Sequence, residues 1–293
     1  MRIFLTSALL FFTIGCRSLF QNDYLFKIQQ EEFFLQGSVL VKGWGIADSC
    51  FKNISFEIPG KPYKAFLYYA GRNSGHLEDK SLYIEGKIVS GRLIYAENVN
   101  KDPAYNRYVH TLRYDVTSFV KRGENNLEIW GFESFINEGL GIVILYEDSN
   151  ESFKRVVLKS GLGFFWSGLE GEERDDSPIV EFKVKSGETP KEVRAFMFFA
   201  GGSDSPRDER VWFRRSSVKL NSSIIANSEL LFENQIASYS GREWDSLDFK
   251  LPLKEEDKFV YFQIESLDFT ASEHNGDSLN FILLGLEIPL AKE

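Results

Sequence analysis

The chain has 293 residues and a formal charge of −9, with 43 acidic against 34 basic side chains. This acidity opposes electrostatic binding to nucleic acid or to an anionic membrane surface, so neither is an expected partner. The length is large for one domain and comfortable for two, each with its own hydrophobic core.

The N-terminus carries a short apolar segment, Ile3–Ile14, which follows Arg2 and leads into Gly15 and Cys16. The segment is too short to span a bilayer, which takes about 20 residues. Gly15 supplies the small residue that a signal peptidase needs before its cut. The pattern resembles the lipobox of bacterial lipoproteins, in which the cysteine is acylated and becomes the first mature residue. We therefore predict a signal peptide over residues 1–15; an ordinary secretory signal or a short membrane anchor is the alternative.

Acylation of Cys16 has two consequences. Two or more acyl chains, palmitate among them, anchor a protein stably, so the predicted partner is the membrane, reached through lipid. Arg17 stands where aspartate would favour retention in an inner membrane, which favours the outer membrane or cell surface. Cys50 then remains as the single thiol, and we expect it to be a small buried apolar residue.

The body of the chain shows the pattern of β-strands. Residues 16–36 lack clear alternation and are expected to form the lipidated N-terminus and a spacer. From Val39 onward, short runs rich in Val, Ile, Phe, Tyr and Leu are separated by Gly, Asn, Asp and Pro, which is typical of a β-sandwich. Residues 142–145 are continuously apolar, as expected for a strand covered on both faces. The clearest predicted strands are Asn53–Ile58, Ala65–Ala70, Leu82–Glu85, Val109–Tyr114, Asn126–Phe132, Gly141–Tyr146 and Arg155–Leu158.

The sequence also repeats itself. KAFLYYAG at Lys64–Gly71 returns as RAFMFFAG at Arg194–Gly201, with Ala, Phe, Ala and Gly in identical places. Two later segments are echoed in the same order, NNLEIWGFES by DKFVYFQIES and GIVILYE by LNFILLGLE. A repeated order of this kind predicts a duplicated domain. The predicted fold is therefore all-β, with two tandem antiparallel β-sandwiches of jelly-roll-like architecture.

The predicted boundary lies at residues 168–178, GLEGEERDDSP, where glycine, charge and proline replace the apolar alternation. This linker divides a first sandwich over residues 37–167 from a second over residues 179–293. The acidic side chains of this segment are expected to be solvated, as in an interdomain linker. The alternative is that they bind calcium, as other loop acids such as Asp204 and Asp208 could.

A family resemblance rests on motifs in the first half. FLYYAG is followed by an acidic turn with a short strand, then by Asp115–Thr117 in YDVTSFV, then by Tyr146–Asp148 at the end of GIVILYED. This succession resembles a domain of unknown function in bacterial and archaeal surface proteins. The later segments WDSLDFKL and GDSLNFILL resemble the second half of the same family, so the resemblance covers residue 39 to the end. It implies an extracellular jelly-roll-like scaffold and brings no known catalytic residues to this chain.

Catalytic and metal motifs are sparse. His76, His110 and His274 show no spacing typical of a zinc or copper site, and there is no nucleophile elbow or phosphate-binding loop. No metal, cofactor or catalytic residue is therefore predicted. Glycoside hydrolysis needs only two carboxylates a few ångströms apart, which sequence spacing does not reveal, so a glycan hydrolase stays open as an alternative.

The most suggestive surface is the segment DERVWFRRSSVKL. If Val211 and Phe213 point inward, alternation places Arg210, Trp212 and Arg214 together on the opposite face. An exposed tryptophan between arginines suits an acidic glycan or a carboxylate-bearing partner. The alternative is that Trp212 packs against the neighbouring domain beneath the arginine stems.

The sequence thus favours a lipid-anchored bacterial surface protein that acts as a non-catalytic binding or adhesion module, with a glycan or host-matrix ligand. Two alternatives remain. One is a glycan hydrolase of tandem jelly-roll type with paired carboxylates, and the other is a structural scaffold in an envelope complex.

Overall fold

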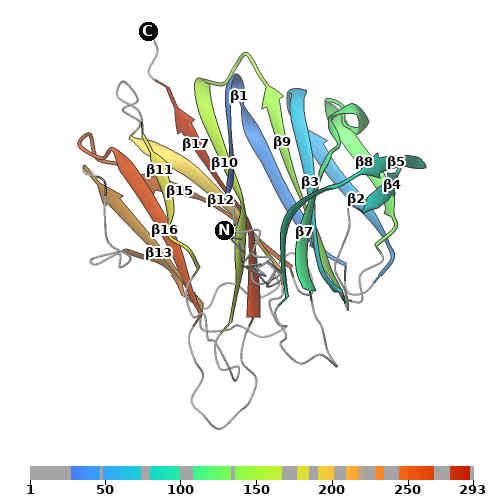
Figure 1. Ribbon diagram of the computed structural model, residues 1–293. Helices are drawn as coiled ribbons and strands as arrows, with labels where there is room; N and C mark the ends of the chain where they lie inside the picture. Colours follow the sequence, from blue (N-terminus) through green and yellow to red (C-terminus); the bar gives the residue numbers. More distant parts are fainter. Residues whose placement is uncertain are drawn as a thin grey trace, which may run out of the picture.

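The computed structural model of the chain is built from antiparallel strands (Figure 1), which confirms the all-β prediction. One short 3-10 turn, Thr117–Phe119, interrupts them within the described part of the chain. No helix there is long and apolar enough to cross a membrane. The structure describes residues 28–46, 49–73, 80–98, 108–132, 136–166, 177–184, 191–200, 209–217, 219, 229–233, 244–266 and 278–290.

The strands fall into two successive sets. The first set is β1 Gln29–Gly45, β2 Phe51–Ile58, β3 Lys61–Asn73, β4 Ser81–Ile84, β5 Lys87–Ser90, β6 Arg92–Asn98, β7 Tyr108–Asp115, β8 Gly123–Trp130 and β9 Ile136–Glu147. The second set is β10 Phe153–Trp166, β11 Val180–Lys183, β12 Glu192–Ala200, β13 Glu209–Ser216, β14 Glu229–Glu233, β15 Trp244–Pro252, β16 Phe259–Ser266 and β17 Ser278–Pro289. All seven strands named from the sequence overlap strands of the structure.

The strand order shows the duplication directly. One nine-stranded sheet has the order β15-β12-β17-β10-β1-β9-β3-β7-β6, and two four-stranded sheets have the orders β11-β16-β13-β14 and β2-β8-β4-β5. The series β1-β9-β3-β7 and β2-β8-β4-β5 therefore recurs strand for strand as β10-β17-β12-β15 and β11-β16-β13-β14. Each set forms a two-sheet sandwich with the strand order of a jelly roll, and the repeated sequences lie on equivalent strands.

This order corrects the predicted boundary. Strand β10 opens the second repeat, and its residues Val157, Leu162 and Phe165 lie in the second hydrophobic core. The repeats therefore divide between β9 and β10, earlier than the linker expected at 168–178. Apolar alternation predicts a strand but does not say which sheet it joins, so β10 was assigned to the wrong side. Residues 167–176 lie outside the described part of the chain.

Strand β1 also corrects the predicted spacer, because it begins at Gln29, inside residues 16–36. Its first part, Gln29–Gln36, pairs with β10, and its second part, Gly37–Gly45, pairs with β9. Most side chains in the first part are only half-buried or exposed, so their polarity pattern gave little sign of a strand. One strand thus joins both repeats into a continuous sheet.

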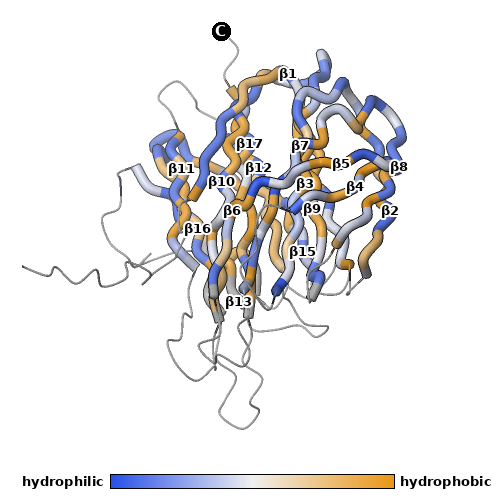
Figure 2. Tube along the Cα trace, turned by 45° about the vertical axis from the view of Figure 1, so that its right-hand side comes forward, coloured by the Kyte–Doolittle hydropathy of each residue, from blue (hydrophilic) through white to orange (hydrophobic). Residues whose placement is uncertain are grey.

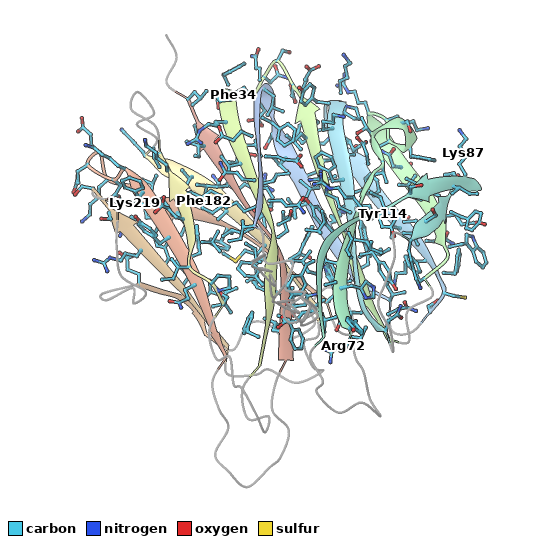
Figure 3. The ribbon with its side chains drawn as sticks, in the orientation of Figure 1. Phe34, Arg72, Lys87, Tyr114, Phe182 and Lys219 are labelled. Carbon is cyan, nitrogen blue, oxygen red and sulfur yellow. The ribbon has the colours of Figure 1, made fainter. Side chains whose placement is uncertain are left out.

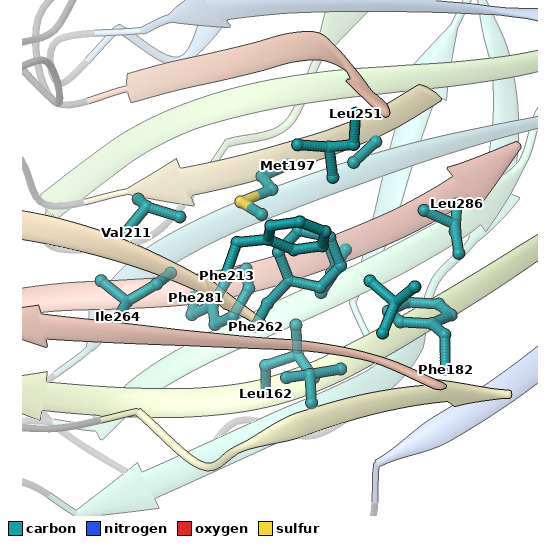
Figure 4. Close-up of a cluster of buried hydrophobic side chains, with 14 of the residues drawn as sticks. Leu162, Phe182, Met197, Val211, Phe213, Leu251, Phe262, Ile264, Phe281 and Leu286 are labelled. Atoms are coloured by element: carbon teal, nitrogen blue, oxygen red, sulfur yellow. The ribbon is translucent and has the colours of Figure 1, made fainter. Parts of the chain in front are cut away.

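Each sandwich has its own apolar core. In the second sandwich, Phe262 packs against Phe182 and Phe213, with ring centroids 6.0 and 5.4 Å away. Figure 4 shows Phe182, Phe213 and Phe262 together with side chains from several strands of both sheets. The burial of Val211 and Phe213 follows the alternation expected for β13.

A third buried cluster, here called the seam, lies between the two sandwiches. Side chains on the two faces of strand β9 contribute to different clusters. Ile142 and Ile144 belong to the first core, whereas Val143 and Leu145 belong to the seam. Both faces of β9 are therefore covered, as its unbroken apolar run predicted, and the tube in Figure 2 shows how apolar residues follow the strands of this sheet. The buried seam residues are Leu35, Val39, Phe66, Tyr68, Ala70, Val143, Leu145, Val156, Leu158, Phe196, Phe198, Ala200, Trp244, Ile282 and Leu283.

Trp244 is the largest side chain of the seam, and three glycines make room for it. A methyl group would lie 2.6 Å from its Cδ1 at Gly43, 2.7 Å from its Cδ2 at Gly139 and 2.7 Å from its Cζ2 at Gly141. Its ring centroid lies 5.6 Å from that of Phe198. The glycines of one sandwich thus allow the tryptophan of the other to pack against backbone.

A buried ionic network ties the same two parts together. The Glu287 carboxylate accepts hydrogen bonds from the Ser38 hydroxyl at 2.9 Å and the Val39 amide at 3.1 Å. It also binds Lys154 Nζ at 2.8 Å and an Arg194 guanidinium nitrogen at 3.4 Å. Ser38 and Val39 lie where the pairing partner of β1 changes from β10 to β9. The network therefore holds β1 in place at that change of partner.

Cys50 is exposed, which corrects its predicted burial. It lies in the turn before β2, and its carbonyl oxygen accepts a hydrogen bond from Gly131 at 3.1 Å. The alternation that buries Ile54 and Phe56 begins only within β2, so the position of Cys50 next to an apolar run did not imply a core site.

Candidate functional site

Buried polar residues gather at one end of the seam, where β3, β6 and β10 finish and β7, β9 and β17 begin. Figure 3 shows Arg72 at this end of the molecule. The group, here called the polar seam cluster, consists of Arg72, Tyr95, Glu97, Thr111, Glu138, Phe164 and Asn280.

Strand register places these side chains on facing surfaces. Glu97 pairs with Val109, which pairs with Arg72, so Glu97 and Arg72 lie on the same face of the first sandwich. Phe164 pairs with Asn280 on the second sandwich. These faces of the two sandwiches are in contact, since the Asn280 amide donates a hydrogen bond to the Thr111 hydroxyl at 3.2 Å.

A chain of contacts connects two carboxylates. Arg72 Nε binds Glu138 Oε1 at 2.6 Å, and the Arg72 guanidinium lies 5.6 Å from the centroid of the Phe164 ring. The Phe164 amide donates to the Tyr95 hydroxyl at 3.0 Å, and that hydroxyl donates to the Glu97 carboxylate. Glu97 and Glu138 thus stand at the two ends of one short path of contacting side chains.

A β-bulge aims Glu138 into the cluster. Ala70 pairs with Gly139 and Gly71 pairs with Asn137, which leaves Glu138 as the extra residue of β9. Bulges redirect a side chain out of the regular alternation and are common next to functional sites. The geometry of β9 therefore explains how a glutamate beside an apolar strand comes to face Arg72.

The cluster contains hydrogen-bond acceptors that no described residue satisfies. Glu138 and Asn280 are fully buried, yet Glu138 Oε2 and Asn280 Oδ1 accept no hydrogen bond from the described residues. A buried acceptor without a donor costs about 1–3 kcal/mol. The Arg72 side chain remains 17% exposed, so the cluster reaches the surface. A ligand that supplies N–H or O–H donors would fit these oxygens.

His110 faces the other way, into the first core. Its ring lies 5.7 Å from that of Tyr69. Burial is the main cause that lowers the pKa of His110 to about 3; the nearby Lys80 charge acts in the same direction, and a hydrogen bond with the Tyr108 backbone opposes it. His110 is therefore neutral at physiological pH. No group of three metal-ligating side chains occurs among the residues that the structure describes.

The arginine–tryptophan face predicted from sequence lies on β13. Arg210, Trp212 and Arg214 alternate there with Val211 and Phe213, which are buried. The side chains of Arg210 and Trp212 lie outside the described part of the structure, so the ligand-binding role of this face stays a prediction.

Arg214 itself is half-buried and lines an open surface pocket of about 320 Å³ with Arg215, Lys254, Asp257 and other polar residues. The pocket contains both acidic and basic side chains. Cys16, the predicted lipid site, lies outside the described residues, as do the loop acids Asp204 and Asp208.

Glu97 and Glu138 were not predicted from the sequence. Each carried a weak signal, because Glu97 ends the apolar run LIYAE and Glu138 precedes the apolar run of β9. A single charge at the end of a strand is common on a solvated surface. Only the strand register shows that these two charges are buried beside the second sandwich.

The chain was compared with known proteins. No family model matches it. No curated protein matches it either. The resemblance to a surface-protein family thus stays a prediction.

Three solved structures match the chain at low similarity. N-glycanase F (PNGase F) has 9% identity and a TM-score of 0.32, over 89% of this chain and 96% of that one. A chain from Sulfolobus turreted icosahedral virus has 12% identity and a TM-score of 0.22, over 89% and 90%. A protein of Parabacteroides distasonis described as secreted has 8% identity and a TM-score of 0.21, over 87% and 90%. Likenesses this low carry no argument about the activity of this chain.

Proposed function

We propose that this protein is a lipid-anchored bacterial surface protein that binds an extracellular ligand at the polar seam cluster. The observation that carries the binding site is the pair of buried acceptors without donors among the described residues, Glu138 Oε2 and Asn280 Oδ1, beside the partly exposed Arg72. Residues from both sandwiches build the cluster, so the duplication supplies a site that neither half has alone.

The ligand must donate hydrogen bonds to these acceptors. Hydroxyl and amide groups do so, and glycans carry both. The Arg72 guanidinium, already bound to Glu138, limits the net negative charge of the cluster and adds donors of its own. A glycan, on a host matrix or on another cell, is therefore the ligand class that we propose.

The test is binding of the purified protein to a printed array of host-type glycans. Glu138→Gln retains an acceptor for Arg72 but replaces the second oxygen by an N–H₂ donor, so we expect at least about a tenfold loss of affinity, about 1.4 kcal/mol. Glu192→Gln, an exposed glutamate paired with Lys250, is the matched control. Equal binding by both variants would show that the seam is not the site.

A second candidate function is glycan hydrolysis, which the two carboxylates of the cluster favour. Hydrolysis of this kind uses one carboxyl group as acid and another as base or nucleophile, and Glu97 and Glu138 are the residues available here. On the same array, an enzyme would remove printed glycan with time, and Glu97→Gln would stop the removal. Stable binding without loss of glycan favours the binding module instead.

The anchor is a separate part of the proposal, supported by the apolar segment and Gly15 before Cys16. Expression in a bacterial host fed a radiolabelled or clickable palmitate is expected to label the wild-type protein and place it in the membrane fraction. Cys16→Ala is expected to remove both the label and the membrane association. A membrane-bound Cys16→Ala variant, or an unlabelled wild type, would contradict the lipid anchor.

The β13 face with Arg210, Trp212 and Arg214 is retained as a second candidate contact surface of the same binding module. Its support is the alternation of the strand, which buries Val211 and Phe213 on the opposite side.

A further inference from the structure

The outer face of the sheet β2-β8-β4-β5 carries a line of large apolar side chains, here called the apolar row. Phe51 pairs with Trp130, Trp130 with Tyr83, and Tyr83 with Ile88, so the four side chains lie side by side across four strands. Trp130 is 43% exposed, Tyr83 48% and Ile88 66%. The Phe51 and Trp130 ring centroids are 4.2 Å apart.

The apolar row lies on one face of the sheet β2-β8-β4-β5, and the other face of that sheet covers the first core. Leu82, Ile84 and Ile129 from the same strands fill that core, so alternation sends the apolar row toward solvent. Strands β4 and β5 lie at the right-hand edge of the molecule in Figure 1. Four adjacent strands span about 14 Å at roughly 4.8 Å between neighbours. The row is thus long and one residue wide.

Polar groups border the row directly. Asn53 and Glu128 form the next pair along β2 and β8, and Ser55 and Asn126 follow, with the Ser55 hydroxyl donating to Asn126 Oδ1 at 2.6 Å. All of these side chains are exposed. A broad protein interface normally has an apolar core ringed by polar residues, whereas here polar residues lie directly beside Phe51 and Trp130, in the middle of the sheet.

The charged groups beside the row are acceptors. Glu128 Oε1 accepts the indole N–H of Trp130 at 2.6 Å, which holds the ring in place. Glu85 Oε1 accepts the Glu128 backbone N–H at 2.7 Å. These carboxylates repel anions and attract hydroxyl donors. They also oppose pairing with the same face of a second copy, because like charges would meet.

We propose that the apolar row binds a neutral glycan chain, with sugar rings stacked on Phe51, Trp130 and Tyr83 and hydroxyl groups donating to Glu128 and Glu85. Sugar rings have an apolar face that suits an aromatic ring and a rim of hydroxyls that suits carboxylates. A linear chain fits the length and the narrow width of the row. This site lies on a different sheet from the polar seam cluster and does not depend on it.

The test is electrophoresis of the full chain through native gels that contain hydroxyethyl cellulose, glycol chitin or soluble xylan. We expect at least one of these polysaccharides to retard the wild type. Trp130→Ala and Tyr83→Ala should each weaken that binding at least about tenfold, about 1.4 kcal/mol. The retardation should persist in high salt, because attraction to a neutral glycan does not rest on charge.

Phe153→Ala is the matched control, since Phe153 is an aromatic residue of β10, 50% exposed and outside the row. It should bind as the wild type does, and all three variants should keep the wild-type urea midpoint. Glu138→Gln should also be retarded normally, which separates the row from the seam. The proposal is overturned if none of the polysaccharides retards the wild type, if Trp130→Ala and Tyr83→Ala bind normally, or if Phe153→Ala loses binding equally.

Discussion

Replacing Trp244 by alanine is expected to lower the free energy of unfolding by about 3–5 kcal/mol, the usual cost of removing a large buried aromatic side chain. Trp244 is fully buried and packs against Phe198 and the backbone at Gly139 and Gly141. The glycine backbone cannot move into the space without breaking its strand pairing. The cavity would therefore persist between the two sandwiches.

Urea unfolding followed by circular dichroism would measure the loss at neutral pH. Phe34→Ala removes an aromatic side chain that is 51% exposed, and it should change stability by no more than about 0.5 kcal/mol. A Trp244→Ala variant as stable as Phe34→Ala would mean that the seam does not hold the sandwiches together. Gly141→Ala tests the same contact from the other side, because its methyl group would lie 2.5 Å from the Phe198 ring.

Glu287→Gln is expected to cost about 2 kcal/mol at neutral pH, because Lys154 would keep only its ion pair with the more exposed Glu151, and Arg194 its ion pair with Asp248. The side chains of Glu287 and Lys154 are only 6% and 9% exposed. Burial alone would lower the pKa of Lys154, but its hydrogen bond and ion pair with Glu287 raise that pKa above its usual value of 10.5. The variant removes this part of the stabilisation of the charged lysine and leaves the part that Glu151 supplies.

The pH dependence follows from the raised pKa of Lys154. Stability from a lysine whose pKa is raised on folding is fully present below its ordinary pKa and is lost as the pH rises past that value. The difference between wild type and Glu287→Gln should thus stay constant from neutral pH to about 10 and shrink above it. Urea midpoints across this range measure it.

The control for this prediction is the double replacement Lys154→Met with Glu287→Leu. Replacing both members of a buried ion pair by apolar residues is often close to neutral, but Glu287→Leu would leave the Val39 amide and the Ser38 hydroxyl without their acceptor. The double variant should therefore recover only part of the stability lost in Glu287→Gln. Wild-type stability in Glu287→Gln would contradict a structural role for the network at the point where β1 passes between the repeats.

Much of the fold could be predicted from sequence because its signals are local. The apolar run of β9 indicated a strand covered on both faces, and the repeat of FLYYAG as FMFFAG marked equivalent strands β3 and β12. Strand partners are not local. The assignment of β10 to the first sandwich was wrong because its alternation suits either sheet, and only its pairing with β1 and β17 decides.

The candidate sites differ in how far the sequence could reveal them. Trp130 alternates with Ile129 and Leu127, so its exposure could be inferred once those residues were assigned to a core. Its pairing with Phe51 and Tyr83 could not, since those residues are distant in sequence. Glu138 faces Arg72 because of a bulge, a departure from alternation that sequence periodicity does not report.

Because β1 pairs with strands of both repeats, the two halves cannot be separated without exposing a strand edge. Cutting the chain between β9 and β10 would leave all of β1 with the first half, so β10 would lose its neighbour over Phe153–Ser160 and the first part of β1 would lose β10. An unpaired strand edge offers backbone groups to any other chain and is a common origin of aggregation. The first part of the 17-residue strand β1 therefore covers an edge of the second half, and we expect the second sandwich expressed alone to aggregate.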